Sequence, residues 1–150
     1  MVAILAGCGD DTVVAPRVVL RYATTGGCVV LGPNCPTYTV WMDGTVDVSR
    51  TGIDAPPEIT GRVPAAEVQE WFASVQDLDP AALAAQVGPG TCNSCVDGTD
   101  IVATIERSGG PVTLDSTQLA FDPSDPTFAA LERLMVDVRA VGALPLRGDG

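Results

Sequence analysis

The sequence predicts an α+β fold, in which two main helices pack on one face of a mostly antiparallel sheet of about five strands. Three observations predict it. Runs of β-branched residues occur in two groups along the chain, each group is followed by a segment with the apolar spacing of a helix, and short turn signals join neighbouring runs. Strands followed by a helix, twice in succession, are typical of α+β domains.

The first group of strands is expected at residues 18–22, 37–42 and 45–49, which are rich in valine, threonine and aromatic residues. The dipeptide Asp43-Gly44 separates the second run from the third. Asp-Gly is the typical pair of a two-residue hairpin turn, because both central positions need positive φ angles. We therefore expect a hairpin here, followed by a loop or an irregular strand at residues 58–60.

The first helix is expected to begin at Pro64, because proline is favoured at the first helical position. Asp79 and Pro80 then restart a short helix over residues 81–87, which Gly88 ends. The apolar face of the first helix consists of Val68, Trp71, Phe72, Val75 and Leu78.

The second half of the chain repeats this order. Residues 99–107 alternate between apolar and polar side chains, residues 108–110 form a turn, and residues 112–114 return as a second hairpin. Asp125 is expected to cap the last helix, which ends near Gly142. Its apolar face consists of Phe128, Leu131, Leu134, Met135 and Val138.

Composition restricts the function. The 150 residues include 19 acidic and eight basic residues, with no histidine, for a formal net charge of −11. This charge argues against nucleic acid as a partner. The absence of histidine and lysine excludes imidazole and Schiff-base catalysis, and no cofactor or metal is expected. Residues 17–142 are expected to form one domain, with a loose tail at residues 143–150.

The tetrad Leu5-Ala6-Gly7-Cys8 resembles the lipobox of bacterial lipoproteins. In that family a diacylglyceryl group is attached to the cysteine thiol, the chain is cut before this cysteine, and the new amino group is often acylated, for instance with palmitate. The resemblance implies that residues 1–7 are the remnant of a signal peptide, that Cys8 is the lipid attachment site, and that residues 8–16 are a tether. Because no basic segment precedes the tetrad, we expect the signal peptide to begin upstream of Met1.

The cysteine count agrees with export. Apart from Cys8 the chain has Cys28, Cys35, Cys92 and Cys95, an even number that suits two disulfides in an oxidising compartment. Three pairings are open. A Cys28–Cys35 bridge would contribute about 2.5 kcal/mol and a bridge between the two pairs about 4.3 kcal/mol in the chain-entropy model, whereas the spacing favours the local pairs. The local pairing is the one we expect.

These cysteines also allow two other functions. Cys92-Asn93-Ser94-Cys95 has the spacing of a redox-active pair, but it lies in a glycine-rich loop that no helix follows. Together with Cys28 and Cys35 it could form a four-thiolate zinc site, although six residues separate that first pair. A structural disulfide is the interpretation that we favour over both.

Two further features concern binding. Val29, Val30 and Leu31 lie between Cys28 and Cys35 and either form an exposed apolar binding loop or continue the first strand into the core. Trp41 and Trp71 are expected in the core rather than as sugar platforms, because Trp71 lies on the apolar helix face and Trp41 in a hairpin strand. A glycosidase, which needs paired carboxylates in an aromatic groove, is therefore not expected.

The segment Cys35-Pro36-Thr37-Tyr38 is followed by Asp43-Gly44 and later by a helix that begins at Pro126. This pattern resembles a group of bacterial secreted and lipid-anchored domains of unknown function, over residues 18–141. The resemblance implies no activity. Taken together, the sequence predicts a lipid-anchored, extracytoplasmic protein of the cell envelope, with the membrane as its partner through Cys8 and with a non-catalytic binding or structural role.

Overall fold

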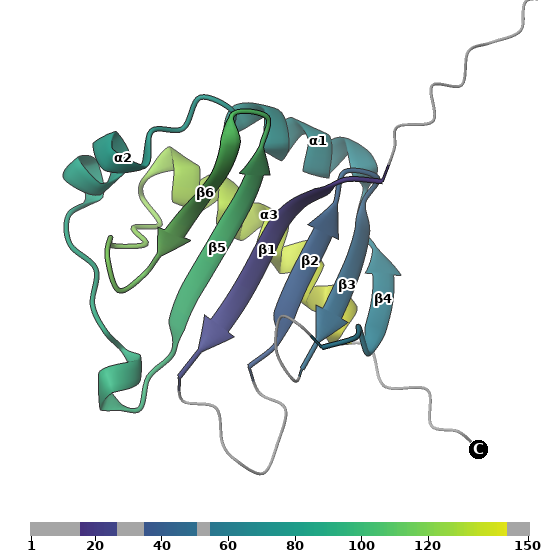
Figure 1. Cartoon of the computed structure of the whole chain (residues 1–150), viewed down its shortest axis with the longest axis horizontal. Coiled ribbons are helices and arrows are strands. Elements are labelled where there is room, and N and C mark those ends of the chain that lie inside the picture. The colour runs from purple at the N-terminus through teal and green to yellow at the C-terminus, as the bar shows by residue number, and fades with distance from the viewer. Residues whose placement is uncertain (1–15, 27–34, 51–54, 144–150) are drawn as a thin grey trace, which may run out of the picture.

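The computed structural model describes residues 16–26, 35–50 and 55–143, which form one six-stranded sheet and three α-helices (Figure 1). Every neighbouring pair of strands is antiparallel, in the order β4-β3-β2-β1-β5-β6. The strands are β1 (Val18–Thr25), β2 (Thr37–Trp41), β3 (Thr45–Ser49), β4 (Ile59–Arg62), β5 (Asp100–Arg107) and β6 (Gly110–Asp115). The helices are α1 (Ala65–Ser74), α2 (Pro80–Val87) and α3 (Pro126–Gly142), with a short 3-10 helix η1 (Ser94–Val96). The predicted α+β class is confirmed.

The sheet has one strand more than predicted. Strand β4 lies where the sequence indicates only a loop or an irregular strand, and it pairs with β3 at the edge of the sheet. Its pattern is weak because Gly61 interrupts it, and glycine lowers strand propensity. The close packing of α3 favours this glycine, since a Cβ atom there would lie 2.5 Å from Cγ1 of Val141 and that side chain would have to shift.

The first hairpin is correctly located, but its turn is wrong in detail. Val40 pairs with Val46, and the Gly44 amide donates to the Trp41 carbonyl at 3.0 Å. This geometry is a three-residue loop in which Gly44 alone has a positive φ, of 86°. Such a loop places only its last residue in the left-handed region. Asp43 contributes by accepting a hydrogen bond from the Thr45 amide at 2.9 Å instead.

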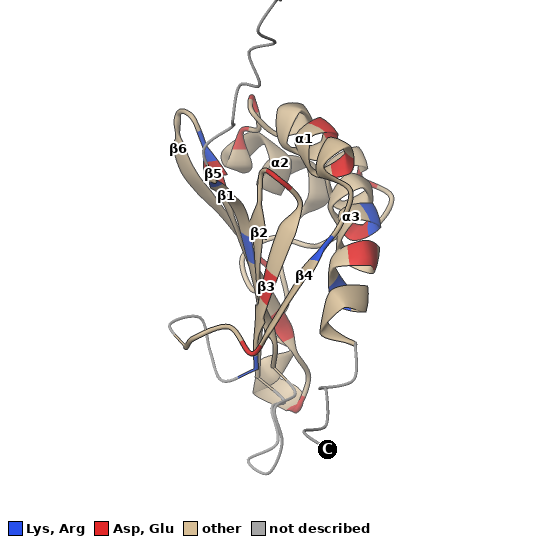
Figure 2. Cartoon of the chain, turned by 90° about the vertical axis from the view of Figure 1, so that its right-hand side faces the viewer, with Lys and Arg blue, Asp and Glu red and all other residues tan. Residues whose placement is uncertain are grey.

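All three helices lie on one side of the sheet (Figure 2). The sheet face toward them supplies a row of fully buried side chains from its central strands, including Leu20, Val40, Val46 and Ile105. Helix α3 packs on β3 and β4 and contacts α1, contributing Leu134, Met135 and Val138 to the core. The apolar face of α3 is predicted correctly. Helix α1 buries Val68, Trp71 and Phe72 as predicted, but it ends at Ser74, so Val75 and Leu78 lie beyond it and Leu78 is only partly buried.

The helix starts also follow the predicted pattern. Asp125 caps α3 by accepting from the Thr127 amide at 2.8 Å, and Asp79 caps α2 through the Ala81 and Ala82 amides. Helix α1 begins one residue after Pro64, which is its N-cap residue. Asp125 additionally accepts from the Gln86 side chain at 2.9 Å, so that it joins α2 to α3.

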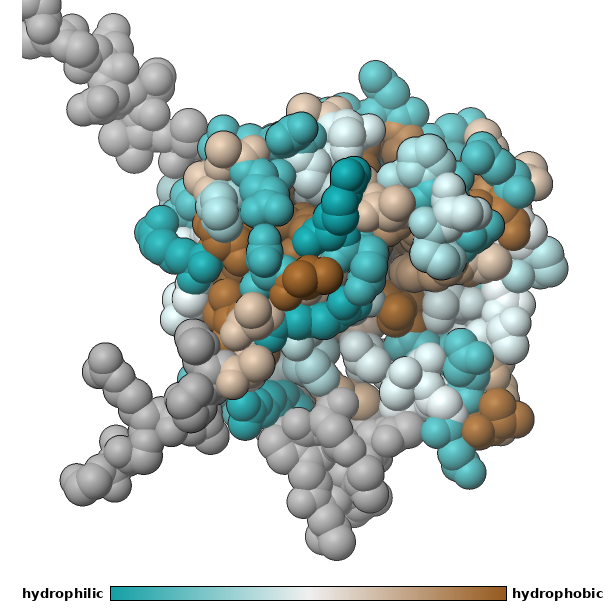
Figure 3. All heavy atoms as spheres, turned by 180° about the vertical axis from the view of Figure 1, so that it is seen from behind, coloured by the Kyte–Doolittle hydropathy of each residue, from teal (hydrophilic) through white to brown (hydrophobic). Residues whose placement is uncertain are grey.

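Over the described ranges, none of the helices has the length and apolar composition that a membrane span requires. The helical side of the molecule is a mosaic of hydrophilic and hydrophobic residues (Figure 3). Among the described residues, the large apolar side chains that are mostly exposed are Val96 at 78% and Val136 at 59%. Within the described ranges, the helical face therefore presents a mixed surface and not a continuous apolar patch of the kind that marks a permanent interface.

Candidate functional site

Several of the residues singled out in the sequence lie outside the described part of the chain. These are the lipid attachment candidate Cys8, the disulfide candidate Cys28, and the loop residues Val29, Val30 and Leu31. Of the remaining candidates, Cys35 is disulfide-bonded, as are Cys92 and Cys95. The expectations for the lipid anchor and the apolar loop therefore stay predictions.

The predicted local pairing of the second cysteine pair is confirmed, since a disulfide joins Cys92 and Cys95 with their Cα atoms 5.4 Å apart. The bridge lies in the loop between α2 and β5, where η1 forms a single turn. Cys95 is exposed, and the loop closes through the Gly98 amide, which donates to the Asn93 carbonyl at 2.7 Å. The sequence indicates this loop but not its internal turn.

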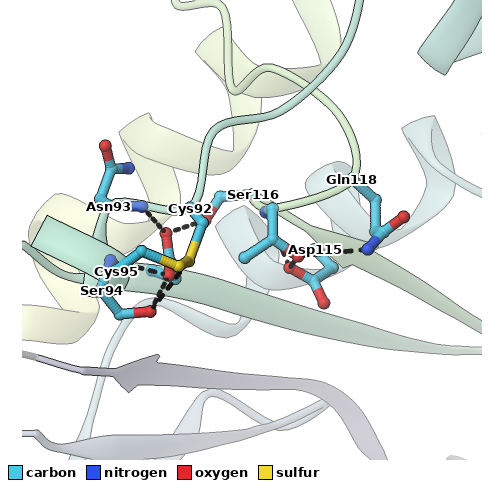
Figure 4. The surroundings of a disulfide bond; sticks show 9 residues. Cys92, Asn93, Ser94, Cys95, Asp115, Ser116 and Gln118 are labelled. Carbon is cyan, nitrogen blue, oxygen red and sulfur yellow. Dashed lines mark hydrogen bonds between the residues drawn. A yellow bond between two sulfur atoms is a disulfide. The ribbon is translucent and has the colours of Figure 1, made fainter.

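Figure 4 shows the Cys92–Cys95 disulfide, with Asn93 and Ser94 between the two cysteines. Both of these residues are hydrogen-bonded to Asp100. Its carboxylate, whose residue is only 2% exposed, accepts from the Asn93 amide at 2.9 Å and from the Ser94 amide and hydroxyl at 3.0 and 2.5 Å. The Ser116 hydroxyl adds a longer contact of 3.4 Å. These donors, the Ser94 hydroxyl above all, hold the pKa of Asp100 below its ordinary value. The two residues between the cysteines are thus fixed to the start of β5.

This arrangement does not favour redox chemistry at the disulfide. A reactive cysteine needs surroundings that stabilise its thiolate, such as a helix N-terminus or a nearby cation. Here Cys92 Sγ lies 3.6 Å from the Ser94 hydroxyl, which is itself committed to the Asp100 carboxylate. A negative charge at that position disfavours a second one on sulfur. In the described ranges no group of three or more His, Cys, Asp or Glu residues is arranged to hold a metal ion.

The other notable surface is the open face of the sheet, which is turned away from the helices (Figure 1). The strand register aligns one side chain from each strand across the full width of this face. From β6 to β4 this polar row consists of Thr113, Thr104, Arg21, Thr39, Asp47 and Thr60. None of its members is buried. At the ordinary strand spacing the row is about 24 Å long.

A shallow hollow of about 180 Å³ lies on this face, over β1, β2 and β3. Its lining includes Trp41 and three members of the polar row, Arg21, Thr39 and Asp47. The expectation that Trp41 lies in the core is wrong. Trp41 shares the face of Thr37 and Thr39, whereas the alternate residues Tyr38 and Val40 point into the core. Trp71, by contrast, is buried as predicted.

Hydrogen bonds fix the orientation of Trp41. Its indole Nε1 donates to Asp47 Oδ2 at 3.0 Å, and Thr60 donates to the other oxygen of the same carboxylate at 2.7 Å. Arg21 is 3.6 Å from Glu106, in a half-exposed ion pair. The Arg21 charge therefore lies beside that of Glu106, and the Asp47 carboxylate is hydrogen-bonded to two neutral groups, one of which is the indole of Trp41.

The floor of the hollow contains a polar group without a partner. Ser49, at 6% exposure, lines the hollow, and its hydroxyl has no hydrogen bond. Buried polar groups are nearly always paired, so an unpaired one calls for an explanation. Because Ser49 lines the hollow, a group bound there is a candidate partner for this hydroxyl.

A second hollow, of about 290 Å³, lies between α1 and α3 and is lined by Glu67, Glu70, Arg133 and Trp71. Burial raises the pKa of Glu67, and the neighbouring Asp137 raises it further. Glu67, Glu70 and Asp137 repel one another here, and they lie on the surfaces where α1 and α3 meet. The open face of the sheet, with its oriented aromatic ring, is the stronger candidate for a binding site.

The predictions from the sequence do not include this site, although the sequence holds a signal for it. Alternation along residues 37–41 places Trp41 with the threonines and opposite Tyr38 and Val40. The polar row is not visible in the sequence, because it depends on the pairing of six strands. Comparison of the chain with protein-family models, with curated proteins and with solved structures finds no match.

Proposed function

We propose that this chain is a lipid-anchored, extracytoplasmic protein of the bacterial cell envelope, and that it acts as a non-catalytic binding module. The observation that carries the proposal is the pairing of Cys92 with Cys95 in a chain that also has the Leu5-Ala6-Gly7-Cys8 tetrad. Disulfides persist in oxidising compartments outside the cytoplasm. Lipidation of Cys8 would keep the domain at a membrane surface.

The non-catalytic role is supported by the chemistry of the open face. Of its carboxylates, Asp47 already accepts from Trp41 and Thr60, and Glu106 lies beside Arg21. A general acid or base needs a carboxyl group that is free to exchange a proton with substrate. An oriented ring beside hydroxyl groups is instead suited to holding a ligand.

Intact mass spectrometry tests the anchor. The full gene, including the region upstream of Met1, is expressed in a bacterium, and the protein is extracted from membranes and alkylated without reduction. We expect a mass that begins at Cys8 and includes acyl chains, with no alkylated thiol. Replacement of Cys8 by serine should abolish the lipid and release the protein. An unlipidated chain with four or five alkyl groups would contradict the proposal.

The alternative function is thiol–disulfide exchange at Cys92 and Cys95, which the spacing of the pair and the exposure of Cys95 favour. It is separated from a structural role by the reduction potential of the pair, measured against glutathione and dithiothreitol. We expect a potential below about −300 mV, as for structural disulfides. A value near that of thioredoxin or above would favour the redox alternative, and zinc bound by the reduced protein would favour a four-cysteine zinc module.

A further inference from the structure

We infer that the open face of the sheet binds a neutral oligosaccharide, which lies along the polar row with one sugar ring in the hollow beside Trp41. This inference rests on the proposed role as a binding module and names its ligand. The ligand would contact the ring of Trp41, the polar row and the unpaired hydroxyl of Ser49.

The aromatic ring indicates one part of the ligand. A pyranose ring has a face of C–H groups, which packs on an aromatic surface, and a rim of hydroxyl groups. Trp41 offers such a surface in a fixed position, because its Nε1 is already bonded to Asp47. An immobilised side chain loses little conformational entropy when a ligand binds. The hollow, at about 180 Å³, has the volume of about six water molecules in the liquid, which suits one ring.

The polar row indicates the rest of the ligand. Threonine hydroxyls donate and accept, arginine only donates and a carboxylate only accepts, so the row offers every kind of partner that sugar hydroxyls need. Thr104 and Thr113 already form one such pair with each other, at 3.3 Å. Threonine is common on the exposed face of any sheet, but here the threonines are in line with the hollow across six strands.

Charge distinguishes this ligand from others. Asp47 and the net charge of −11 disfavour an anion. A cation needs carboxylate oxygens, but those of Asp47 already accept from Trp41 and Thr60, and Glu106 lies beside Arg21. A purely apolar ligand would leave the hydroxyl groups of the row without partners. A peptide strand binds to the edge of a sheet and not to its face, because the backbone N–H and C=O groups lie in the plane of the sheet. A neutral polyhydroxylated chain satisfies all of these conditions.

The test is calorimetric titration of the full chain, disulfides intact, with cellohexaose, maltohexaose and chitohexaose. We expect at least one of them to bind with a Kd below about 1 mM. Trp41→Ala should weaken that binding at least tenfold, and Thr39→Val, which removes a hydroxyl but keeps the shape, about threefold. Val136→Ala, at an exposed position on α3 on the opposite side of the molecule, is the matched control and should bind as the parent does.

Thermal unfolding of each variant checks that the fold is intact. The inference is overturned if none of the three hexasaccharides binds at millimolar concentration, or if Trp41→Ala binds as well as the parent. Dextran sulfate and a mixture of neutral hexapeptides are titrated in parallel. Binding of either in place of the saccharides would overturn the ligand class but retain the binding module, whereas loss of the lipid anchor in the mass experiment would leave saccharide binding unaffected.

Discussion

Asp100 holds the loop that contains the Cys92–Cys95 disulfide. Three donors from Asn93 and Ser94 converge on its carboxylate, so one charge at the start of β5 organises a segment that otherwise has few buried contacts. Charge-assisted hydrogen bonds of this kind are stronger than neutral ones. The disulfide and Asp100 therefore stabilise the same turn.

We predict that Asp100→Asn destabilises the protein in a pH-dependent way. The pKa of Asp100 is lowered in the folded state, chiefly by the Ser94 hydroxyl. A carboxylate with a lowered pKa stabilises the fold above its unfolded pKa, near 3.8, and this contribution is lost as the pH falls through the lower, folded value. The difference in unfolding free energy between parent and variant should be constant above about pH 5 and shrink below about pH 4. Urea unfolding at a series of pH values measures it.

Asp122→Asn is the matched control for this prediction. Asp122 also accepts from a serine amide and hydroxyl, those of Ser124, and its pKa is lowered as well, but both residues belong to an exposed turn. We expect it to lower the melting temperature less than half as far as Asp100→Asn does. Equal effects would show that Asp100 is not an anchor of the disulfide loop.

At the scale of single elements, the β2–β3 hairpin depends on one backbone conformation. Gly44 has a positive φ, and a Cβ atom there would overlap the Val63 carbonyl oxygen at the start of α1. The glycine thus serves the turn and also allows the hairpin to approach the helix closely. The position of Trp41 at the end of β2 depends on the same turn.

We predict that Gly44→Ala lowers the unfolding free energy by about 1–3 kcal/mol, the range for residues forced into sparsely populated backbone regions. Thermal or urea unfolding measures the loss. Gly109→Ala in the β5–β6 turn is the control, because a Cβ atom there meets nothing within 4 Å and its φ is not positive. That variant should change stability by less than about 1 kcal/mol. Equal losses of unfolding free energy in the two variants would show that the positive φ of Gly44 does not determine the stability of the first hairpin.

For the whole molecule, the decisive feature is that the sheet has two different faces. One face packs against the layer of α1 and α3 (Figure 2). The other face carries the polar row and the hollow. Neighbouring residues in one strand consequently have opposite roles. In β1, Leu20 is fully buried, while the side chain of Arg21 is 39% exposed on the open face.

We predict that Leu20→Ala costs about 2–5 kcal/mol of stability, because it leaves a cavity in the core. Arg21→Ala, one residue away, should cost less than about 1 kcal/mol, since a half-exposed ion pair contributes little. Chemical denaturation of the two variants gives the comparison. Similar losses would mean that the open face is packed as tightly as the core, and the binding site proposed there could not exist.

The sequence by itself predicts most elements of this fold, because their signals are local. Asp125 and Asp79 before proline mark the starts of α3 and α2, and apolar spacing gives the buried faces of both main helices. The local pairing of Cys92 with Cys95 also follows from short spacing. Strand β4 and the turn at Gly44 are less well predicted, because they depend on contacts with α3 and with Val63.

Only the tertiary structure decides where the candidate site lies. Arg21, Thr39, Asp47 and Thr104 are far apart in the sequence, and the register of antiparallel strands alone brings them into one row. The position of Trp41 outside the core likewise depends on which face α1 and α3 cover. Composition, caps and spacing determine what each segment becomes, because these effects act over a few residues. The pairing of distant strands determines which side chains meet, because that choice minimises the free energy of the whole chain.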